Sequence, residues 1–385
     1  MATDKFTIAE RTLVDHPRKG TPFELTHLED VRDYLRKIEA RQNPQDVRAK
    51  ITEFDLDLSV RPVVAHFTNN ALGGSQLLMT RNALSQLRKH VLPSGKFFDG
   101  LKELAVMGED GGKLATQVWH KFARHNDRHL VFRAVLMKLG NEVRPVVRAS
   151  VTDRYAKYSN LQMVEDLLSR QETRVKPVLS WTVTDNVMRL RFSTIDELEK
   201  VMAQFDNDYY HKHPIPVFDM WNSETGCRSV VMKSGLYHVV KQTGLGFWSE
   251  RGNVSWPHQG SSFRLPSNVT ARLAEVTGAA DELLQAYSQA STVIVEDPKG
   301  WVASRLSKYP NVPDRVLAAV KKALDNDAMT TDNSLSAVVD AVTLAAKEER
   351  DITFQETLES ISGSILRAGL DIAMDNNGIV PKKRK

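Results

Sequence analysis

The sequence of 385 residues contains one cysteine, Cys227, so no disulfide can form within the chain. A chain of this length without disulfides is typical of a reducing compartment, and we therefore expect a cytoplasmic protein of a bacterial host. The most apolar stretches, such as Val338–Ala346, are short or interrupted by charge, whereas a membrane-spanning helix needs about 20 apolar residues. The first residues also lack the apolar core of a signal peptide. We expect no contact with a membrane.

Several motifs of catalysis and cofactor binding are missing or incomplete. The segment Gly108–Leu114 has three residues, where a P-loop has four, before its Gly-Lys pair, and a leucine follows the lysine. We therefore interpret it as a loop, with Gly111-Gly112 as a flexible turn. Gly244-Leu245-Gly246 lacks the third glycine of a dinucleotide-binding motif, and the chain has no Cys-x-x-Cys and no Gly-x-Ser-x-Gly. We expect no cofactor and no metal site, and these motifs do not identify an enzymatic activity.

Periodicity and turn residues predict an α+β fold, with a central antiparallel sheet, an inserted helix, a helical N-terminal part and an acidic all-helical C-terminal region. Strand pairs are expected across Gly140-Asn141, Asp185-Asn186 and Ser223–Gly226, with the inserted helix over Asn160–Leu168. The expected later helices lie near 268–289, 298–307, 312–325, 333–347 and 354–373. We predict four segments: an N-terminal lead (1–60), an α+β core domain (61–265), a helical C-terminal domain (266–374) and a basic tail (375–385).

Charge is unevenly distributed, although the net charge is only +4. Residues 61–200 hold 22 Lys and Arg against 14 Asp and Glu, whereas residues 265–380 hold 10 against 17. A phosphate backbone would be attracted to the middle of the chain and repelled by the C-terminal region.

The strongest functional signal lies between residues 128 and 191, where nine of twelve basic residues are arginine. Guanidinium groups match phosphate oxygens and stack on bases. If the strand has no bulge, its alternation places Arg144, Arg148 and Arg154 on one side. We predict a nucleic-acid-binding surface with phosphate contacts from Arg144, Arg148, Arg154, Lys157, Arg189 and Arg191, and with base stacking by Tyr155 or Trp181. The alternative is a solvated sheet face with aromatic residues in the core.

Two further functions remain open from the residues alone. Asp153, Asp219 and Glu224 lie near predicted strand ends, where two carboxylates would hold magnesium in a nuclease. The acidic C-terminal region would instead suit a structural or scaffold protein with a protein partner. The basic tip contains Lys382, Lys383 and Arg384, which would bind phosphate or act as a nuclear-import signal in a nucleated host.

Two stretches carry a resemblance to a known family. Arg144–Tyr155 resembles the strand and Ser/Thr-Asp-Arg-Tyr turn of the phage- and plasmid-borne domain of unknown function 932. Trp221–Gly226 resembles the Asn-Ser-Glu-x-Gly turn of the same family. The chain departs from the family where His238 replaces an arginine and where Gln242-Thr243-Gly244 replaces Cys-Asn-Gly.

The resemblance covers about 130–265 and implies a role in the DNA metabolism of a mobile element, such as replication or recombination. It supplies no catalytic residues. A relation to phage single-strand annealing proteins is a further implication, since those proteins use a basic sheet surface and assemble into rings. We therefore expect non-enzymatic binding of single-stranded DNA, with strand annealing by a homo-oligomer as its extended form.

Overall fold

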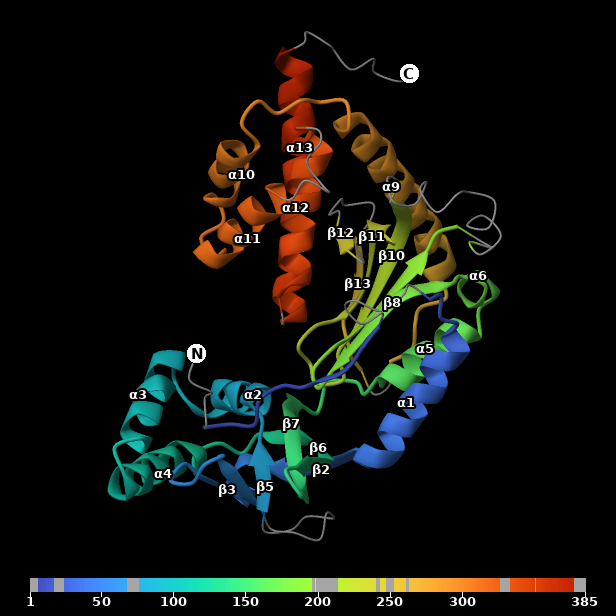
Figure 1. Ribbon diagram of the computed structural model, residues 1–385. Coiled ribbons are helices and arrows are strands. Elements are labelled where there is room, and N and C mark those ends of the chain that lie inside the picture. Colours follow the sequence, from blue (N-terminus) through green and yellow to red (C-terminus); the bar gives the residue numbers. More distant parts are fainter. Residues whose placement is uncertain are drawn as a thin grey trace.

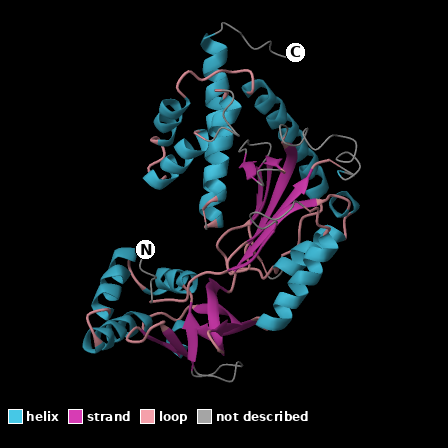
Figure 2. Cartoon of the chain, viewed as in Figure 1, coloured by secondary structure: helices cyan, strands magenta, loops and turns pink. Residues whose placement is uncertain are grey.

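The computed structural model describes residues 6–16, 24–67, 76–195, 198, 214–239, 243–246, 253–260, 263–325, 333–349 and 351–376. The fold is mixed α+β, as predicted, but its strands form two sheets and not one central sheet (Figures 1 and 2). The difference arises because several strands pair with partners far away in the sequence, and a local pattern does not encode such pairings.

The larger sheet has seven antiparallel strands and lies above the smaller sheet in Figure 1. Its strands, in spatial order, are β1 (Thr12–His16), β8 (Val178–Thr184), β9 (Met188–Ser193), β10 (Ile215–Asn222), β11 (Val230–His238) and β12 (Thr243–Gly246), with β13 (Asn253–Trp256) also paired to β11. The predicted strand pairs across Asp185-Asn186 and Ser223–Gly226 are present as β8–β9 and β10–β11.

The smaller sheet has six strands and one parallel pair, formed by β5 and β7. Its spatial order is β2 (Gln45–Lys50), β6 (His129–Leu139), β7 (Glu142–Thr152), β5 (Gln76–Met79), β4 (Val64–Phe67) and β3 (Phe54–Asp57). The predicted hairpin across Gly140-Asn141 is β6–β7, and Gly140 adopts a φ of 63° in its turn. Residues from the N-terminal segment therefore enter both sheets.

Helices α2 (Arg81–Val91), α3 (Gly95–Ala105) and α4 (Glu109–Ala123) share one apolar core with the smaller sheet. The expected loop at Gly108–Leu114 is wrong, because α4 begins at Glu109 and includes both following glycines. The helix passes so close to the chain at Ser59 that a Cβ on Gly112 would lie 2.7 Å from the Ser59 Cα. Gly112 therefore serves close packing and not flexibility.

Helices α1 (Leu28–Gln42), α5 (Asn160–Leu168) and α9 (Val269–Ala290) cover one face of the larger sheet. Leu190, Phe192, Phe218 and Met232 face them, so this side of the sheet is apolar. The inserted helix has the predicted bounds, and Ser159 caps it by accepting the Gln162 backbone N–H at 3.0 Å. The short helix α6 (Gln171–Arg174) leads into β8.

The helices after residue 266 form where the sequence predicts them. They are α9, α10 (Pro298–Leu306), α11 (Asp314–Leu324), α12 (Leu335–Lys347) and α13 (Ile352–Asn376). Asp297 and Ser334 cap α10 and α12 with side-chain hydrogen bonds. α12 and α13 pack together and both reach β12, so the C-terminal helices lie directly against the larger sheet (Figure 1). None of the helices in the described ranges combines the length and apolar character that a bilayer crossing requires.

Candidate functional site

The predicted phosphate-binding arginines do not share one surface. Arg144 and Arg148 lie on β7 of the smaller sheet, whereas Arg189 and Arg191 lie on β9 of the larger sheet. Arg148, Arg189 and Arg191 are buried, with exposed fractions of 5%, 5% and 4%. These three residues therefore cannot contribute to an outer surface in this conformation.

A β-bulge explains the placement of Arg148. In the β6–β7 ladder Ala134 is paired with Val147 and Arg133 with Ala149, which leaves Arg148 as the extra residue. A bulge changes the alternation of side chains, so Arg148 leaves the row that it would share with Arg144 in a regular strand. The Arg148 carbonyl is satisfied by donors from Thr80 Oγ1 and Asn82 Nδ2, both at 3.1 Å. The bulge is thus a fixed feature of the fold.

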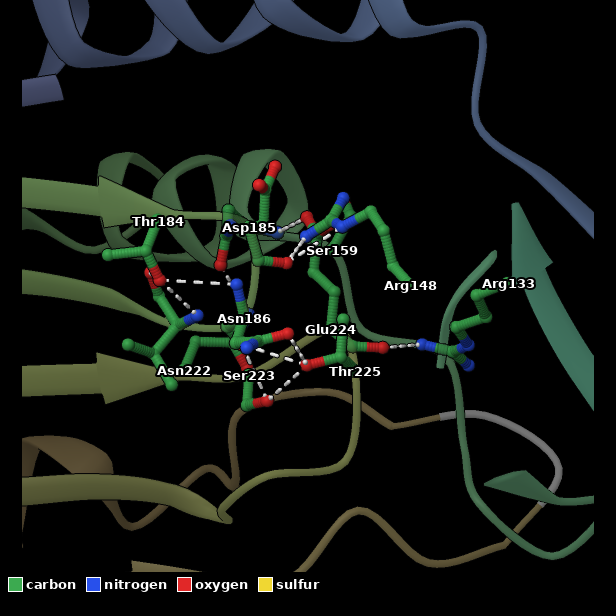
Figure 3. A network of polar contacts seen from close by, with 12 residues as sticks. Arg133, Arg148, Ser159, Thr184, Asp185, Asn186, Asn222, Ser223, Glu224 and Thr225 are labelled. Atoms are coloured by element: carbon green, nitrogen blue, oxygen red, sulfur yellow. Dashed lines mark hydrogen bonds and ion pairs between the residues drawn. The ribbon is translucent and has the colours of Figure 1, made fainter. Parts of the chain in front are cut away.

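Arg148 joins the two sheets through hydrogen bonds and an ion pair (Figure 3). Its Nε donates to the Asp185 carbonyl at 2.7 Å, and its Nη2 donates to the same oxygen. Its Nη1 lies 3.4 Å from Glu224 Oε2. Glu224 Oε1 also accepts the backbone N–H of Asn160 at 2.6 Å, at the start of α5, where a negative charge is favourable. One buried arginine therefore connects β7 to the turns β8–β9 and β10–β11.

The β10–β11 turn is held from both sides. Ser223 Oγ and Thr225 Oγ1 donate to the Asn186 carbonyl at 2.8 and 3.0 Å, within the larger sheet. From the smaller sheet, the Tyr155 hydroxyl donates to the Ser223 carbonyl at 2.6 Å, and Arg133 Nη1 donates to the Glu224 carbonyl. The two stretches that carry the family resemblance, 144–155 and 221–226, therefore meet in one network (Figure 3).

A cavity of about 260 Å³ opens beside this network. Its charged lining consists of Arg133, Arg148, Lys157, Glu39, Asp46 and Glu224. Burial and the nearby charge of Glu224 raise the pKa of Glu39, against the opposing effects of Ser159 and Lys157. Three cations face three carboxylates, so the lining is balanced and does not favour a simple anion.

Arg189 and Arg191 belong to a second, fully buried cluster. Asp219 accepts Arg189 Nε at 2.9 Å and Arg191 Nε at 2.7 Å. Glu359 of α13 accepts Arg189 Nη1 at 3.3 Å and Arg191 Nη2 at 3.1 Å. Burial raises the pKa of Glu359, although the charge of Arg191 opposes this effect. Each predicted phosphate-binding arginine on β9 is therefore bound to neighbouring acids.

The two aromatic residues predicted to stack on bases are already engaged. Trp181 is 6% exposed and contacts Tyr34 edge to face, with ring centroids 5.3 Å apart. Tyr155 is half-buried and stacks on His258 at 4.9 Å and 9°. Burial lowers the pKa of His258 to about 4, helped by the nearby Arg133 charge and opposed by a backbone hydrogen bond. Trp181 is therefore a core residue, and Tyr155 is a structural contact in this conformation.

A smaller set of cations remains on the surface. Arg154 and Lys157 are exposed, and Arg144 is half-buried. Two exposed residues that the sequence reasoning left out of the site, Arg48 and Arg128, lie at the same end of the strands β2, β6 and β7. Lys382, Lys383 and Arg384 lie outside the described residues.

We define the basic rim as Arg48, Arg128, Arg154 and Lys157. The strand register brings its members together, because Arg48 is paired with Val131, Val131 with Val151, and the Arg128 carbonyl accepts the Ile51 N–H at 3.1 Å. None of the four forms an ion pair with another described residue. Asp127 and Asp153 are exposed beside Arg128 and Arg154 in the sequence, and Lys157 also lines the cavity that holds Glu39, Asp46 and Glu224. Polar and apolar residues alternate along β2, with Arg48 at a polar position between Val47 and Ala49. This alternation is the sequence signal that could have identified Arg48 as exposed.

The carboxylates considered for a nuclease are not brought together. Asp219 points toward α13 and is occupied by arginines, whereas Glu224 is occupied at the junction of the sheets. Asp153 is exposed after β7. Across the described ranges, no group of three or more His, Cys, Asp or Glu residues is arranged to hold a metal ion.

Comparison with known proteins gave no match to any protein-family model, to any curated protein or to any solved structure. The resemblance of 144–155 and 221–226 to domain of unknown function 932 therefore stays a prediction.

Proposed function

We propose that the protein binds nucleic acid through its phosphate backbone, with single-stranded DNA as the expected ligand, and that it does so without catalysing a reaction. The observation that carries the proposal is the basic rim, in which four cations without a described ion-pair partner lie at one end of three neighbouring strands. Exposed cations without an ion pair are available to a phosphate backbone, whereas Arg189 and Arg191 already pair with Asp219 and Glu359.

The geometry favours phosphate contacts over base stacking. Arg154 and Lys157 flank Tyr155, whose ring lies against His258 and whose hydroxyl is bound to Ser223. Binding driven by counterion release weakens steeply with salt and discriminates little between sequences. We therefore expect similar affinity for unrelated sequences of equal length.

The choice of single-stranded DNA rests on the resemblance in 144–155 and 221–226, which implies a function in mobile-element DNA metabolism. Annealing of two strands by a homo-oligomer is part of the same proposal. It predicts that protein bound to DNA sediments as a species larger than one chain.

The test is a pair of double variants with equal changes in charge. Arg154→Glu with Lys157→Glu alters the basic rim, whereas Lys96→Glu with Lys121→Glu alters exposed lysines on α3 and α4. Fluorescence anisotropy would follow binding to labelled single-stranded DNA, double-stranded DNA and single-stranded RNA. The rim variant should bind single-stranded DNA about tenfold or more weakly than the control variant, which corresponds to the loss of two phosphate contacts.

Equal binding by the two variants would refute the basic rim as the interface. Equal affinity of the wild type for all three nucleic acids would keep the phosphate interface and reject the preference for single-stranded DNA.

A further inference from the structure

The face of the larger sheet opposite α1, α5 and α9 is charged, and the N-terminal part of α13 covers it. Arg189 and Arg191 on β9 and Lys233 on β11 project from this face, and Arg228 follows the β10–β11 turn. Their partners from α13 are Glu356 and Glu359. Arg228 Nη1 lies 2.7 Å from Glu356 Oε2, and Lys233 also contacts Glu356.

The covered face has an excess of positive charge when the helix is left out of the count. Arg189, Arg191 and Arg228 stand against one carboxylate of the sheet in this area, Asp219, and the helix adds two carboxylates. Burial and the charge of Arg228 lower the pKa of Lys233 to about 6, so the excess of charge comes from the three arginines. Asp15 lies farther along the same face, on edge strand β1, and is exposed. The helix thus supplies most of the negative charge that neutralises the face.

The cations surround aromatic rings. The Arg228 and Arg189 guanidinium carbons lie 4.3 and 4.9 Å from the ring centroid of Trp221. The Arg191 guanidinium carbon lies 5.4 Å from the ring centroid of Tyr237. Arginines next to exposed aromatic rings are what proteins use to bind single strands, through phosphate contacts and base stacking.

The contact with α13 is poorly suited to stability alone. A buried ion cluster loses much of its Coulomb energy to desolvation, and apolar residues of similar size are often as stable or more stable. The opposite face of the same sheet is covered by apolar contacts from three helices, whereas on this face Ile352 of α13 forms one small apolar cluster with Val187, Trp221 and Val231. In addition, the buried atoms Trp221 Nε1 and Arg228 Nε have no hydrogen-bond partner among the described residues.

The sequence of α13 contains a point where the helix can bend. Ser362-Gly363-Ser364 begins three residues after Glu359, and the Ser362 and Ser364 hydroxyls donate to carbonyls four residues earlier, at 2.8 and 3.2 Å. Glycine beside serine, and hydroxyls bound to the previous turn, both favour bending of a helix. Leu358 and Ile361 before this point, and Ile365, Leu366 and Leu370 beyond it, all lie in the apolar core of the C-terminal helices. Release of the acidic part therefore has to break the contacts of Leu358 and Ile361 as well as the ion pairs.

We propose that the sheet face formed by Arg189, Arg191, Lys233 and Trp221 is a second site for a single nucleic-acid strand, occupied in the free protein by Glu356 and Glu359 of α13. The inference rests on the proposed function and deepens it. In this proposal the two carboxylates occupy the positions of phosphate oxygens. A bound strand replaces them by bending α13 at Ser362–Ser364, which also releases Ile352 from the sheet face and Leu358 and Ile361 from the helical core. The same face continues onto β8, where Ser180 and Thr182 are only half-buried. The nucleic-acid strand would first contact the protein on this accessible side.

The first measurement uses the wild-type chain. Hydrogen–deuterium exchange, with and without a saturating single-stranded oligonucleotide, should show faster exchange in 352–361 and unchanged protection in 365–373. Unchanged or slower exchange in 352–361 at saturation would overturn the proposal.

The second measurement compares two double variants of equal charge. Glu356→Gln with Glu359→Gln removes the stand-in carboxylates, whereas Glu348→Gln with Glu349→Gln removes two acids just before α13 that do not contact the sheet cluster. The first variant should bind the oligonucleotide on the order of tenfold more tightly than the second, a typical coupling between a displaced element and a ligand.

The outcomes separate this proposal from the proposed function. Wild-type binding with equal affinities for the two variants overturns the second site and leaves the basic rim as the interface. Binding by the Glu356/Glu359 variant alone supports the second site and overturns the rim. An absence of binding by all three proteins overturns both.

Discussion

Replacement of Asp219 by asparagine tests the buried charge cluster most severely. Asp219 accepts Arg189 Nε at 2.9 Å and Arg191 Nε and Nη2 at 2.7 and 2.9 Å, and its exposed fraction is 7%. Asparagine keeps the shape but removes the charge and turns one acceptor into a donor that faces a guanidinium group. Breaking a buried ion pair by removing one partner costs about 3–5 kcal/mol, because the remaining charge stays buried without compensation.

Urea unfolding followed by tryptophan fluorescence measures this loss, with Trp221 beside Arg189 as a local reporter. The control is Glu275→Gln, which breaks the exposed pair between Arg272 and Glu275 on α9, with 2.8 Å between Nη1 and Oε2. An exposed pair of this kind contributes about 0.3–0.5 kcal/mol. Equal losses in the two variants would show that the Asp219 cluster is hydrated, and would refute the reasoning on the face under α13.

Three further predictions concern the junction and the alternative activity. Gly226→Ala should lower the free energy of unfolding by about 2 kcal/mol or more, and Gly140→Ala by about 1 kcal/mol. Both glycines have a positive φ, but only a Cβ on Gly226 would meet another side chain, Val151 Cγ1, at 2.9 Å. Equal losses in urea unfolding would contradict this close approach. The pKa of His258 is about 4 in the folded protein and near 6.5 in the unfolded chain, so between these pH values the unfolded chain binds one more proton. The free energy of unfolding therefore decreases as the pH is lowered from about 6.5 to about 4. Stability curves for His258→Gln should be flatter in that window, and an unaltered slope would speak against a buried neutral ring. Labelled DNA should stay intact with magnesium or manganese, whereas cleavage that Glu224→Gln abolishes would support a nuclease.

The local structure follows from the sequence where the signals are local. The helices after residue 266 and α5 have caps and apolar periodicity within their own segments, and the structure confirms them. The hairpins β6–β7, β8–β9 and β10–β11 are marked by turn residues and confirmed in the same way. The pairing of β1 with β8 and of β2 with β6 joins distant segments, so it was not predictable from short-range patterns. The proposed boundary near residue 265 stays a prediction.

The candidate site shows the limit of strand alternation as an argument for exposure. Arg189 and Arg191 alternate with Leu190 and Phe192, which is typical of a strand with one face in water. Both arginines are buried because α13, which is far away in the sequence, covers this face of the sheet, and its Glu359 pairs with them. A charged strand face therefore indicates solvent or a charged partner, and only the tertiary structure distinguishes the two.

The most direct test of the account is the salt dependence of single-stranded DNA binding by the wild type and by the Arg154→Glu, Lys157→Glu variant. The logarithm of the binding constant should fall linearly with the logarithm of salt concentration, and the slope should be shallower in the variant by about 1.4, which is about 0.7 for each lost phosphate contact. Identical slopes would mean that no phosphate is held by these two residues, and the proposed interface would be wrong.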